Sequence, residues 1–322
     1  MTLETETVLD RRRLSRRVSL WLALAVAGIV VGLFALAAPG DLLTEALGTN
    51  QIARISVEGM IQEDRRQLKL LKRVANADNV KAVLVFVNSP GGTTTGGEAL
   101  FVALRDVAKK KPVVAQFGTV AASAGYIVGL AADHIVSRGN TVTGSVGVIF
   151  QWPEVSGLLD KIGVKVNEVK SGPLKANPSP FTPANEQGIE VAENMVSDGF
   201  AWFLSLVEAR RGVKPYEIPG LAQGRIFSGR EAVALKLADE IGGEDEAVKW
   251  LRETRNIPED LEVVDWKPKP SSSFGLLTSL GSLAARLLGG VNTNLAQIIS
   301  RDPGLSTLGL DGLLSVWHPS EN

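Results

Sequence analysis

The sequence contains no cysteine, and this absence excludes several kinds of site at once. Disulfides, thiolate-bound zinc, iron–sulfur clusters and a cysteine nucleophile are all ruled out. Lys+Arg 34 and Asp+Glu 35 nearly cancel, so the net charge of -1 gives no reason to expect a nucleic-acid-binding surface. Histidine is also scarce, because His134 and His318 are the two in 322 residues. A hydrolase built from this chain therefore has few imidazoles to use as a general base.

A basic cluster followed by an apolar run marks the N-terminus. Five arginines between residues 11 and 17 precede residues 18–40, which carry no charge. About 20 apolar residues suffice for a helix to cross a bilayer, and arginines on one flank place that flank in the cytoplasm. The sequence therefore predicts a cytoplasmic segment at 1–17, a single transmembrane helix at 18–40 and an extracytoplasmic (periplasmic) remainder on the inner (plasma) membrane. A cleaved signal peptide is the alternative, because Ala35-Leu36-Ala37 resembles a cleavage site.

Apolar runs and helical periodicities alternate along the rest of the chain. Residues 82–87 and 113–117 are continuous apolar runs typical of buried strands. Residues 98–109 and 184–211 repeat apolar side chains at helical spacing. The alternation predicts an α/β domain, which we expect to occupy residues 41–265.

Two predicted strands and one short helix contain or border the candidate site residues. We expect the strand over residues 82–87 to stop at 88–92, because the Pro and Gly residues there are typical of a turn. A further strand is predicted over 142–149, and a short apolar helix over 123–132.

The C-terminal tail, residues 266–322, is predicted as a linker followed by an amphipathic segment. Residues 266–273 are rich in Pro and Ser, which is typical of a linker. Beyond them, six leucines fall on one face of a helix: Leu276, Leu277, Leu280, Leu283, Leu287 and Leu288. Such a face suits a membrane surface, an apolar cleft, another subunit or an ordinary core position, and the sequence does not choose between them.

Two segments offer nucleophilic catalysis without histidine. Ser123 stands among small residues where a strand is predicted to give way to a helix. The N–H of Ala124 is then a natural donor to a reacting oxygen, and the turn at 90–92 offers a second. Lys175 lies in a Gly- and Pro-containing loop, and a lysine that burial keeps neutral is the usual substitute for a histidine base. Each residue alone has an ordinary interpretation: Ser123 as a helix cap, and Lys175 as a solvent-facing side chain.

Taken together, an ordered set of motifs resembles the signal peptide peptidase A family of membrane-anchored serine peptidases. The matching segments run through most of residues 52–250. They are NSPGG (88–92), VAASAGY (120–126), AADHIVSRGNTVTGSVGVI (131–149), SGPLK (171–175), GRIFSGREA (224–232) and LADEIGG (237–243).

The resemblance implies a Clp-protease/crotonase-like α/β spiral and a set of residue roles. Ser123 would be the nucleophile, Lys175 the general base, and Ser145 would orient the lysine. The N–H groups of Gly92 and Ala124 would form the oxyanion hole. The resemblance also implies no metal or organic cofactor, a ring-shaped homo-oligomer, and hydrophobic substrates such as cleaved signal peptides and membrane-protein segments.

Two departures from the family pattern and three alternatives accompany this interpretation. Many relatives have Gly at the position of Ala124 and Asp at that of Ala176. Residues 121–125 resemble a degenerate nucleophile elbow, so His318 could complete a Ser–acid–His order instead. A membrane-anchored scaffold would use the same fold without catalysis. An acyl-CoA enzyme would share the oxyanion-hole geometry, but a domain facing away from the cytoplasm disfavours it.

Overall fold

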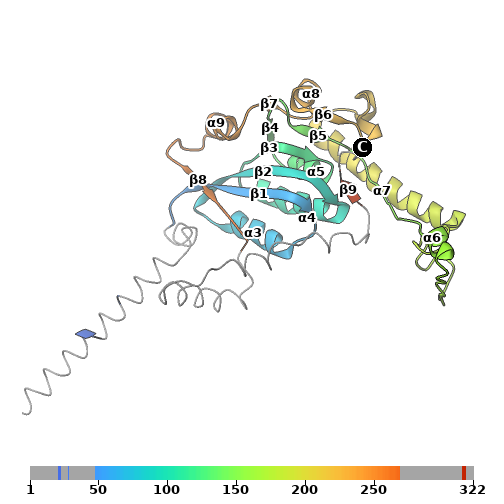
Figure 1. Cartoon of the computed structure of the whole chain (residues 1–322). Helices are drawn as coiled ribbons and strands as arrows, with labels where there is room; N and C mark the ends of the chain where they lie inside the picture. Colours follow the sequence, from blue (N-terminus) through green and yellow to red (C-terminus); the bar gives the residue numbers. More distant parts are fainter. Residues whose placement is uncertain (1–20, 23–27, 29–47, 269–313, 317–322) are drawn as a thin grey trace, which may run out of the picture. The chain divides into compact units, whose positions relative to one another are not determined.

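The computed structural model describes residues 21–22, 28, 48–268 and 314–316 (Figure 1). The chain divides into two units, Met1–Asn50 and Gln51–Asn322, and the fold below is that of the second. Among the described residues, none of the helices has the length and apolar character needed to cross a membrane. The predicted segments 1–17 and 18–40 lie outside the described residues, except for residues 21, 22 and 28.

Parallel strands form the centre of a mixed sheet. β1 (Gln51–Ile61) pairs with β2 (Val80–Thr93), and β2 pairs with β3 (Val113–Ala122). β8 (Glu262–Asp265) lies parallel to β1 on its other side. The two continuous apolar runs of the sequence thus form buried central strands, and the prediction of an α/β domain is confirmed.

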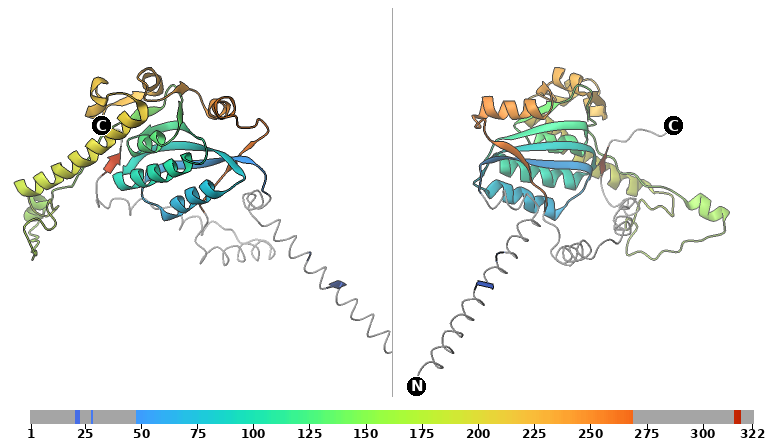
Figure 2. Two further views of the ribbon diagram at one scale, coloured as in Figure 1. Left: turned by 180° about the vertical axis from the view of Figure 1, so that it is seen from behind. Right: turned by 60° about the vertical axis from the view of Figure 1, so that its left-hand side comes forward.

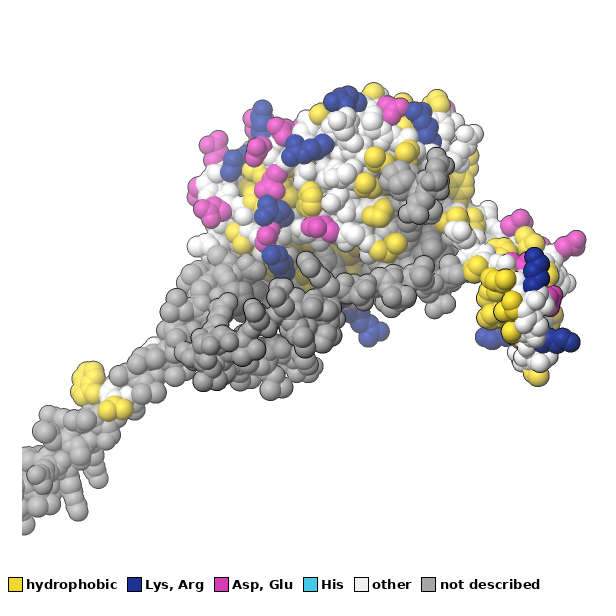
Figure 3. Space-filling model, viewed as in Figure 1, with side chains coloured by type: hydrophobic (Ala, Val, Ile, Leu, Met, Phe, Trp, Pro, Cys, Tyr) yellow, Lys and Arg dark blue, Asp and Glu magenta, His cyan; other side chains and the backbone are white. Residues whose placement is uncertain are grey.

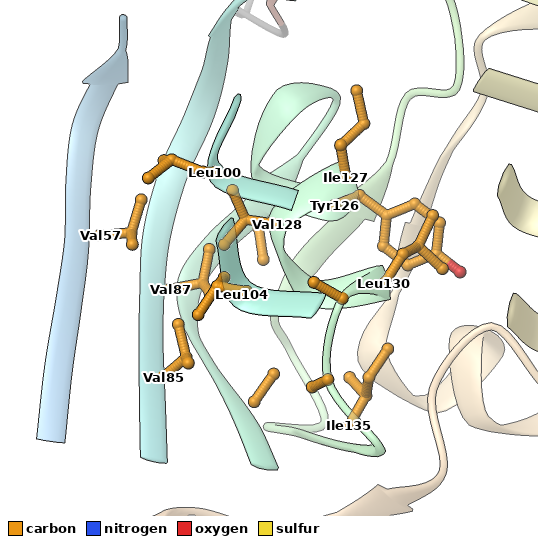
Figure 4. Close-up of a cluster of buried hydrophobic side chains, with 14 of the residues drawn as sticks. Val57, Val85, Val87, Leu100, Leu104, Tyr126, Ile127, Val128, Leu130 and Ile135 are labelled. Atoms are coloured by element: carbon orange, nitrogen blue, oxygen red, sulfur yellow. The ribbon is translucent and has the colours of Figure 1, made fainter. Parts of the chain in front are cut away.

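Helices cover both faces of the sheet (Figures 1 and 2). α3 (Arg65–Asn76), α4 (Thr94–Ala108) and α5 (Ala124–Leu130) follow successive central strands. Leu104 of α4 packs with Val85 and Val87 in one apolar cluster, part of which Figure 4 shows. α9 (Glu244–Arg255) packs on the other face.

Neighbouring residues of β2 therefore enter different cores. Val83, Val85 and Val87 face the cluster with α4, whereas Ala82 and Leu84 face the cluster with α9. Burial on both faces explains why this strand lacks the alternation of polar and apolar residues seen in half-exposed strands.

The third strand changes partner along its length. Val114–Phe117 pair with β4 (His134–Ser137), whereas Val120–Ala122 pair with β5 (Val142–Gly144). On its other side, β4 pairs in parallel with β7 (Glu240–Ile241). β5 pairs with β6 (Ile226–Ser228), which runs antiparallel to it. The C-terminal end of β3 is consequently set between β2 and β5, and α5 begins there.

A long helix and a projecting segment complete the unit. α7 (Glu186–Arg211) is anchored near its C-terminal end, where the Arg210 guanidinium donates to the carbonyl oxygens of Leu130 (2.8 Å) and Ala132 (2.7 Å). We define the arm as residues 156–185, which include α6 (Ser156–Lys161). The arm lies at the N-terminal end of α7, away from the sheet (Figures 1 and 2).

The remaining short elements follow α7 or lie at the C-terminus. They are η1 (Pro215–Glu217), η2 (Leu221–Gln223), α8 (Gly229–Ala234) and β9 (Leu314–Val316).

Two predicted strand ends are wrong. β2 does not turn at residues 88–92 but continues to Thr93, because Ile61 of β1 still pairs with Gly92 after a register shift. A Cβ at Gly92 would lie 1.8 Å from the carbonyl oxygen of Ile61, so this glycine permits close strand approach and not a turn. The strand predicted over 142–149 ends at Gly144, because Gly144 and Ser145 both adopt positive φ, 82° and 51°.

Candidate active site

Ser123 occupies the sharp junction between β3 and α5. Its backbone has φ 57° and ψ -119°, a conformation that costs a non-glycine residue about 1–3 kcal/mol. Hydrogen bonds on both sides hold it. Its N–H donates to the carbonyl oxygen of Gly144 at 2.8 Å, and its own carbonyl accepts from the N–H of Ile127 at 3.0 Å. A strained serine fixed at a strand-to-helix turn is the geometry of a nucleophile elbow.

Behind this turn, buried polar contacts fix the neighbouring strands. The hydroxyl of Thr143 donates to the carbonyl oxygen of Ala121 at 2.7 Å, which ties β5 to the last residues of β3. The Tyr126 hydroxyl donates to the carbonyl oxygen of Leu237 at 2.8 Å, and burial raises the pKa of this phenol. Sequence reasoning missed both residues, although a lone tyrosine in an otherwise apolar helix signals a buried polar anchor.

A pocket of about 400 Å³ opens beside Ser123. Ser145 lines the same pocket, since the pairing of Ala122 with Gly144 brings the ends of β3 and β5 together. The other walls are mostly apolar. They consist of Val146, Gly147, Val148, Ile149, Val196, Phe200, Ala222, Gln223 and Gly224. The pocket is thus suited to an apolar side chain held next to the Ser123 hydroxyl.

The glycine-containing end of β2 packs against the start of α5. Ser89 pairs with Ala121, two residues before Ser123, so the end of β2 lies beside the last residues of β3. A Cβ added to Gly125 would lie 2.7 Å from the carbonyl oxygen of Ser89. The segment containing Gly92 and the first residue of α5, Ala124, therefore both border the turn at Ser123. These are the two predicted oxyanion donors.

The side chain of Ser89 maintains the conformation of this segment. Its hydroxyl accepts a hydrogen bond from the N–H of Gly91 at 3.1 Å and is buried. The sequence signal was a serine directly before Pro-Gly-Gly, a position where a hydroxyl commonly bonds to backbone two residues on.

Replacing Gly92 by alanine is expected to destabilise the fold and remove activity. The new Cβ would meet the Ile61 carbonyl oxygen, a backbone atom that cannot withdraw without breaking the pairing of β1 with β2. We expect a loss of about 3 kcal/mol or more in the free energy of unfolding, measured by thermal or urea denaturation. Gly157→Ala is the matched control, because nothing lies within 4 Å of its Cβ. A Gly92→Ala protein as stable as the control would contradict this account of the strand.

Lys175 lies apart from Ser123 within one chain. A Cβ on Gly188 would be 2.5 Å from the Asn177 side-chain oxygen, which places the lysine loop at the first turn of α7. The α7 residues that line the Ser123 pocket, Val196 and Phe200, come 8 to 12 residues later, about 12–18 Å along the helix axis. A single chain thus brings Ser123 and Ser145 together but not Lys175, and no lysine or histidine is among the described residues that line the pocket.

His134 is far from the nucleophile. It pairs with Val114, nine residues before Ser123 on β3, which corresponds to about 30 Å along the strand. Its ring stacks on Trp250 with centroids 4.6 Å apart, and its nitrogens lie 3.7 Å from Asp239 and 3.5 Å from Glu240. His134 is therefore a packing residue of β4, and His318 lies outside the described residues.

The end of β2 also receives a second segment of the chain. β9 runs antiparallel to it, with Ser315 opposite Gly92 and Leu314 opposite Thr93. This edge of the sheet pairs with an extended chain at Gly91, Gly92 and Thr93, the way in which a peptide adds a strand to a sheet. Within the part of the chain that the structure describes, no group of three or more His, Asp or Glu side chains could hold a metal ion.

Comparisons with known proteins agree with a peptidase fold. The model of Peptidase family S49 matches residues 105–258, and that of Clp protease matches residues 50–141. A Synechocystis protein assigned as a protease is 34% identical over 224 residues, 68% of this chain and 80% of its own. An Enterococcus faecium protein assigned as signal peptide peptidase SppA is 31% identical over 275 residues, 81% of this chain and 79% of its own. Among solved structures, a ClpP1 mutant from Listeria monocytogenes is 19% identical with a TM-score of 0.42, covering 64% of this chain and 99% of that one.

The two family models and the two relatives identify the class as a serine protease with a Clp-protease-like α/β fold. More narrowly, the chain belongs to the signal peptide peptidase A family, peptidase family S49.

Proposed function

We propose that the protein is a membrane-anchored serine endopeptidase that cleaves hydrophobic peptides, including remnant signal peptides, with Ser123 as nucleophile and Lys175 as base. The strained backbone of Ser123, which presents its side chain beside an apolar pocket, carries the proposal. Membership of the family supports it.

The chemistry follows from the assigned groups. The amine of Lys175 accepts the hydroxyl proton as the Ser123 oxygen attacks the peptide carbonyl. The N–H groups of Gly92 and Ala124 donate to the oxyanion that forms. Its collapse breaks the C–N bond, and the lysine returns the proton to the leaving amine. Water, deprotonated by the same lysine, then attacks the ester on Ser123, and the lysine gives this proton to the Ser123 oxygen as the C–O bond breaks. Ser145 positions the lysine in both steps.

The base is proposed to come from a neighbouring copy of the chain. Lys175 is remote from Ser123 in one chain, and it lies on the arm, whose side chains are unusually apolar for a solvent-facing segment. Val169, Ile162 and Leu158 are all exposed there, and Figure 3 shows hydrophobic side chains gathered over this part of the molecule. Packing the arm onto a neighbour would bury this surface and deliver the lysine. A ring of identical subunits repeats that contact at every site.

The pocket predicts a preference for apolar residues immediately before the cleaved bond. Ala222→Leu should narrow the pocket and lower kcat/KM about tenfold for peptides with Leu at that position, while peptides with Ala are cleaved nearly as before. Ala222→Ser preserves the volume and serves as the control. Fluorogenic peptide pairs measure the ratio. If Ala222→Leu slows both peptides equally, the pocket does not hold the side chain before the scissile bond.

The proposed anchor is residues 18–40, with residues 41–322 on the outer side of the inner membrane. Protease digestion of intact spheroplasts tests this directly. Digestion of the domain without lysis supports the proposed sidedness, and protection until lysis contradicts it.

A further inference from the structure

An apolar groove of about 690 Å³ runs between α3 and α4 on the outer side of the helical layer. Leu68, Leu71 and Ala75 of α3 form one apolar wall, and Ala99, Val102 and Ala103 of α4 form the other. Val102 is 52% exposed. Polar and charged side chains complete the lining: Lys72, Asn76, Asp106, Lys109 and Lys110. Two adjacent helices with an apolar furrow between them present the surface into which a third amphipathic helix fits.

The chain leaves the described fold beside α3. The Trp266 N–H donates to the carbonyl oxygen of Arg54 at 2.9 Å. The Arg73 guanidinium lies over the Trp266 ring, 5.8 Å from its centroid, and donates to the carbonyl oxygen of Lys267 at 3.2 Å. Because Arg73 belongs to the last turn of α3, the tail starts from the C-terminal end of this helix.

The next segment that the structure describes, β9, lies at the other end of the same layer. Leu314 of β9 pairs with Thr93, which caps the N-terminus of α4. The C-terminal ends of α3 and α4 lie together, since the ammonium of Lys110 donates to the Asn76 side-chain oxygen at 2.7 Å. The part of the chain that the structure describes therefore ends at one end of the α3–α4 layer, just after Lys267, and resumes at the other, at Leu314.

The sequence between these two points contains a segment that matches the groove in length and chemistry. Residues 276–288 carry six leucines on one helical face and a single charge, Arg286. As a helix they would extend about 20 Å, and α4 with its 15 residues extends about 22 Å. We infer that residues 276–288 bind as a helix in the groove between α3 and α4, with the leucine face against Val102.

The short tether favours a segment of the same chain over a second copy. Eight residues separate Lys267 from Leu276, so the segment is held near the groove at a high effective concentration. Bound there, the tail covers the apolar furrow and holds the chain along the layer toward its pairing site on β2, beside Gly92.

Engineered cysteine pairs test this placement in the full-length protein, because the chain has no cysteine of its own. Val102→Cys combined with Leu280→Cys is expected to form an intrachain disulfide on mild oxidation, seen as a faster-migrating monomer on a non-reducing gel. Leu276→Cys and Leu283→Cys extend the test over one helical turn on each side. Val102→Cys with Ser282→Cys is the matched control, since Ser282 is about 200° around the helix from Leu280.

Two results would overturn the inference. Equal cross-linking of Leu280→Cys and Ser282→Cys would mean that no defined face is bound. Disulfide-linked dimers in place of the fast monomer would assign the groove to a second copy.

A substitution in the groove gives an independent readout. Val102→Asp is expected to release the segment, so that limited proteolysis within residues 269–313 becomes at least about tenfold faster. The thermal stability of the domain should change little, because Val102 is half exposed. Val191→Asp is the control, since Val191 is similarly exposed on α7 outside the groove. Unchanged proteolysis of the Val102→Asp protein in detergent, where no bilayer competes for the tail, would contradict the inference.

Discussion

Ser123→Ala is expected to reduce peptide cleavage by at least about 10⁴-fold, because removal of a nucleophile leaves only binding and oxyanion stabilisation. The domain should remain folded, since alanine at φ 57° meets the same backbone strain as serine. Two measurements check this: hydrolysis of a leucine-rich fluorogenic peptide, and labelling by a fluorophosphonate followed by mass mapping of the modified residue. Both signals should disappear in the variant.

A second buried serine provides the control for this prediction. Ser137 is the last residue of β4, and its hydroxyl donates to the carbonyl oxygen of Arg138. Ser137 does not line the Ser123 pocket. Ser137→Ala should retain cleavage and labelling. Ser145→Ala should retain labelling in part and lose activity less completely than Ser123→Ala, since Ser145 positions the base. Label on any residue other than Ser123 would contradict the assignment of the nucleophile.

Mixing two inactive variants is expected to restore activity. If Lys175 reaches Ser123 of a neighbouring subunit, a co-assembled mixture of Ser123→Ala and Lys175→Ala chains contains complete sites. Random assembly pairs an intact serine with an intact lysine at about a quarter of positions, so about a quarter of wild-type activity should return. The variants are co-expressed with different tags and purified through both tags in sequence, which selects mixed assemblies. Each variant purified alone should stay inactive.

The contrary result is equally clear. If the lysine served the serine of its own chain after rearrangement of the arm, every mixed site would lack one group and the mixture would be inactive. An arm variant separates assembly from chemistry. Val169→Asp places a charge on the exposed apolar surface of the arm and should lower both the oligomer mass and the activity, although it leaves Ser123 and Lys175 intact.

Some parts of the site could be predicted from local sequence pattern, whereas others depend on the pairing of strands that are distant in the sequence. The position of Ser123 at a strand-to-helix junction follows from local pattern, because an apolar run ends in small residues and a helical run begins. The proximity of Ser145 to Ser123 depends on the pairing of β3 with β5, a contact between residues about 20 positions apart. No local pattern carries such a contact, and only the family resemblance pointed to it.

The end of β2 shows why some features could not be predicted. Pro90, Gly91 and Gly92 are typical of a turn, but glycine also permits close approach between two backbones, and single-sequence patterns do not separate the two uses. The helix α9 was missed for a different reason. Its buried residues, Ala247, Val248 and Leu251, recur at the spacing of one helical face, so the signal was present in the sequence although the segment is mostly charged. If Lys175 acts on a neighbouring subunit, as proposed, its distance from Ser123 depends on the assembly of subunits, which no pattern within one chain encodes.

Cleavage of a leucine-rich, signal-peptide-like fluorogenic substrate by the full-length protein in detergent tests the central claim most directly. The wild type is compared with Lys175→Ala, Lys175→Arg and the double variant His134→Ala/His318→Ala. We predict that the double histidine variant retains cleavage, whereas both lysine variants lose it at unchanged oligomer mass, because arginine remains charged and cannot accept the serine proton. A Lys175→Ala protein that still cleaves, or a histidine variant that does not, would contradict a peptidase built on Ser123 and Lys175.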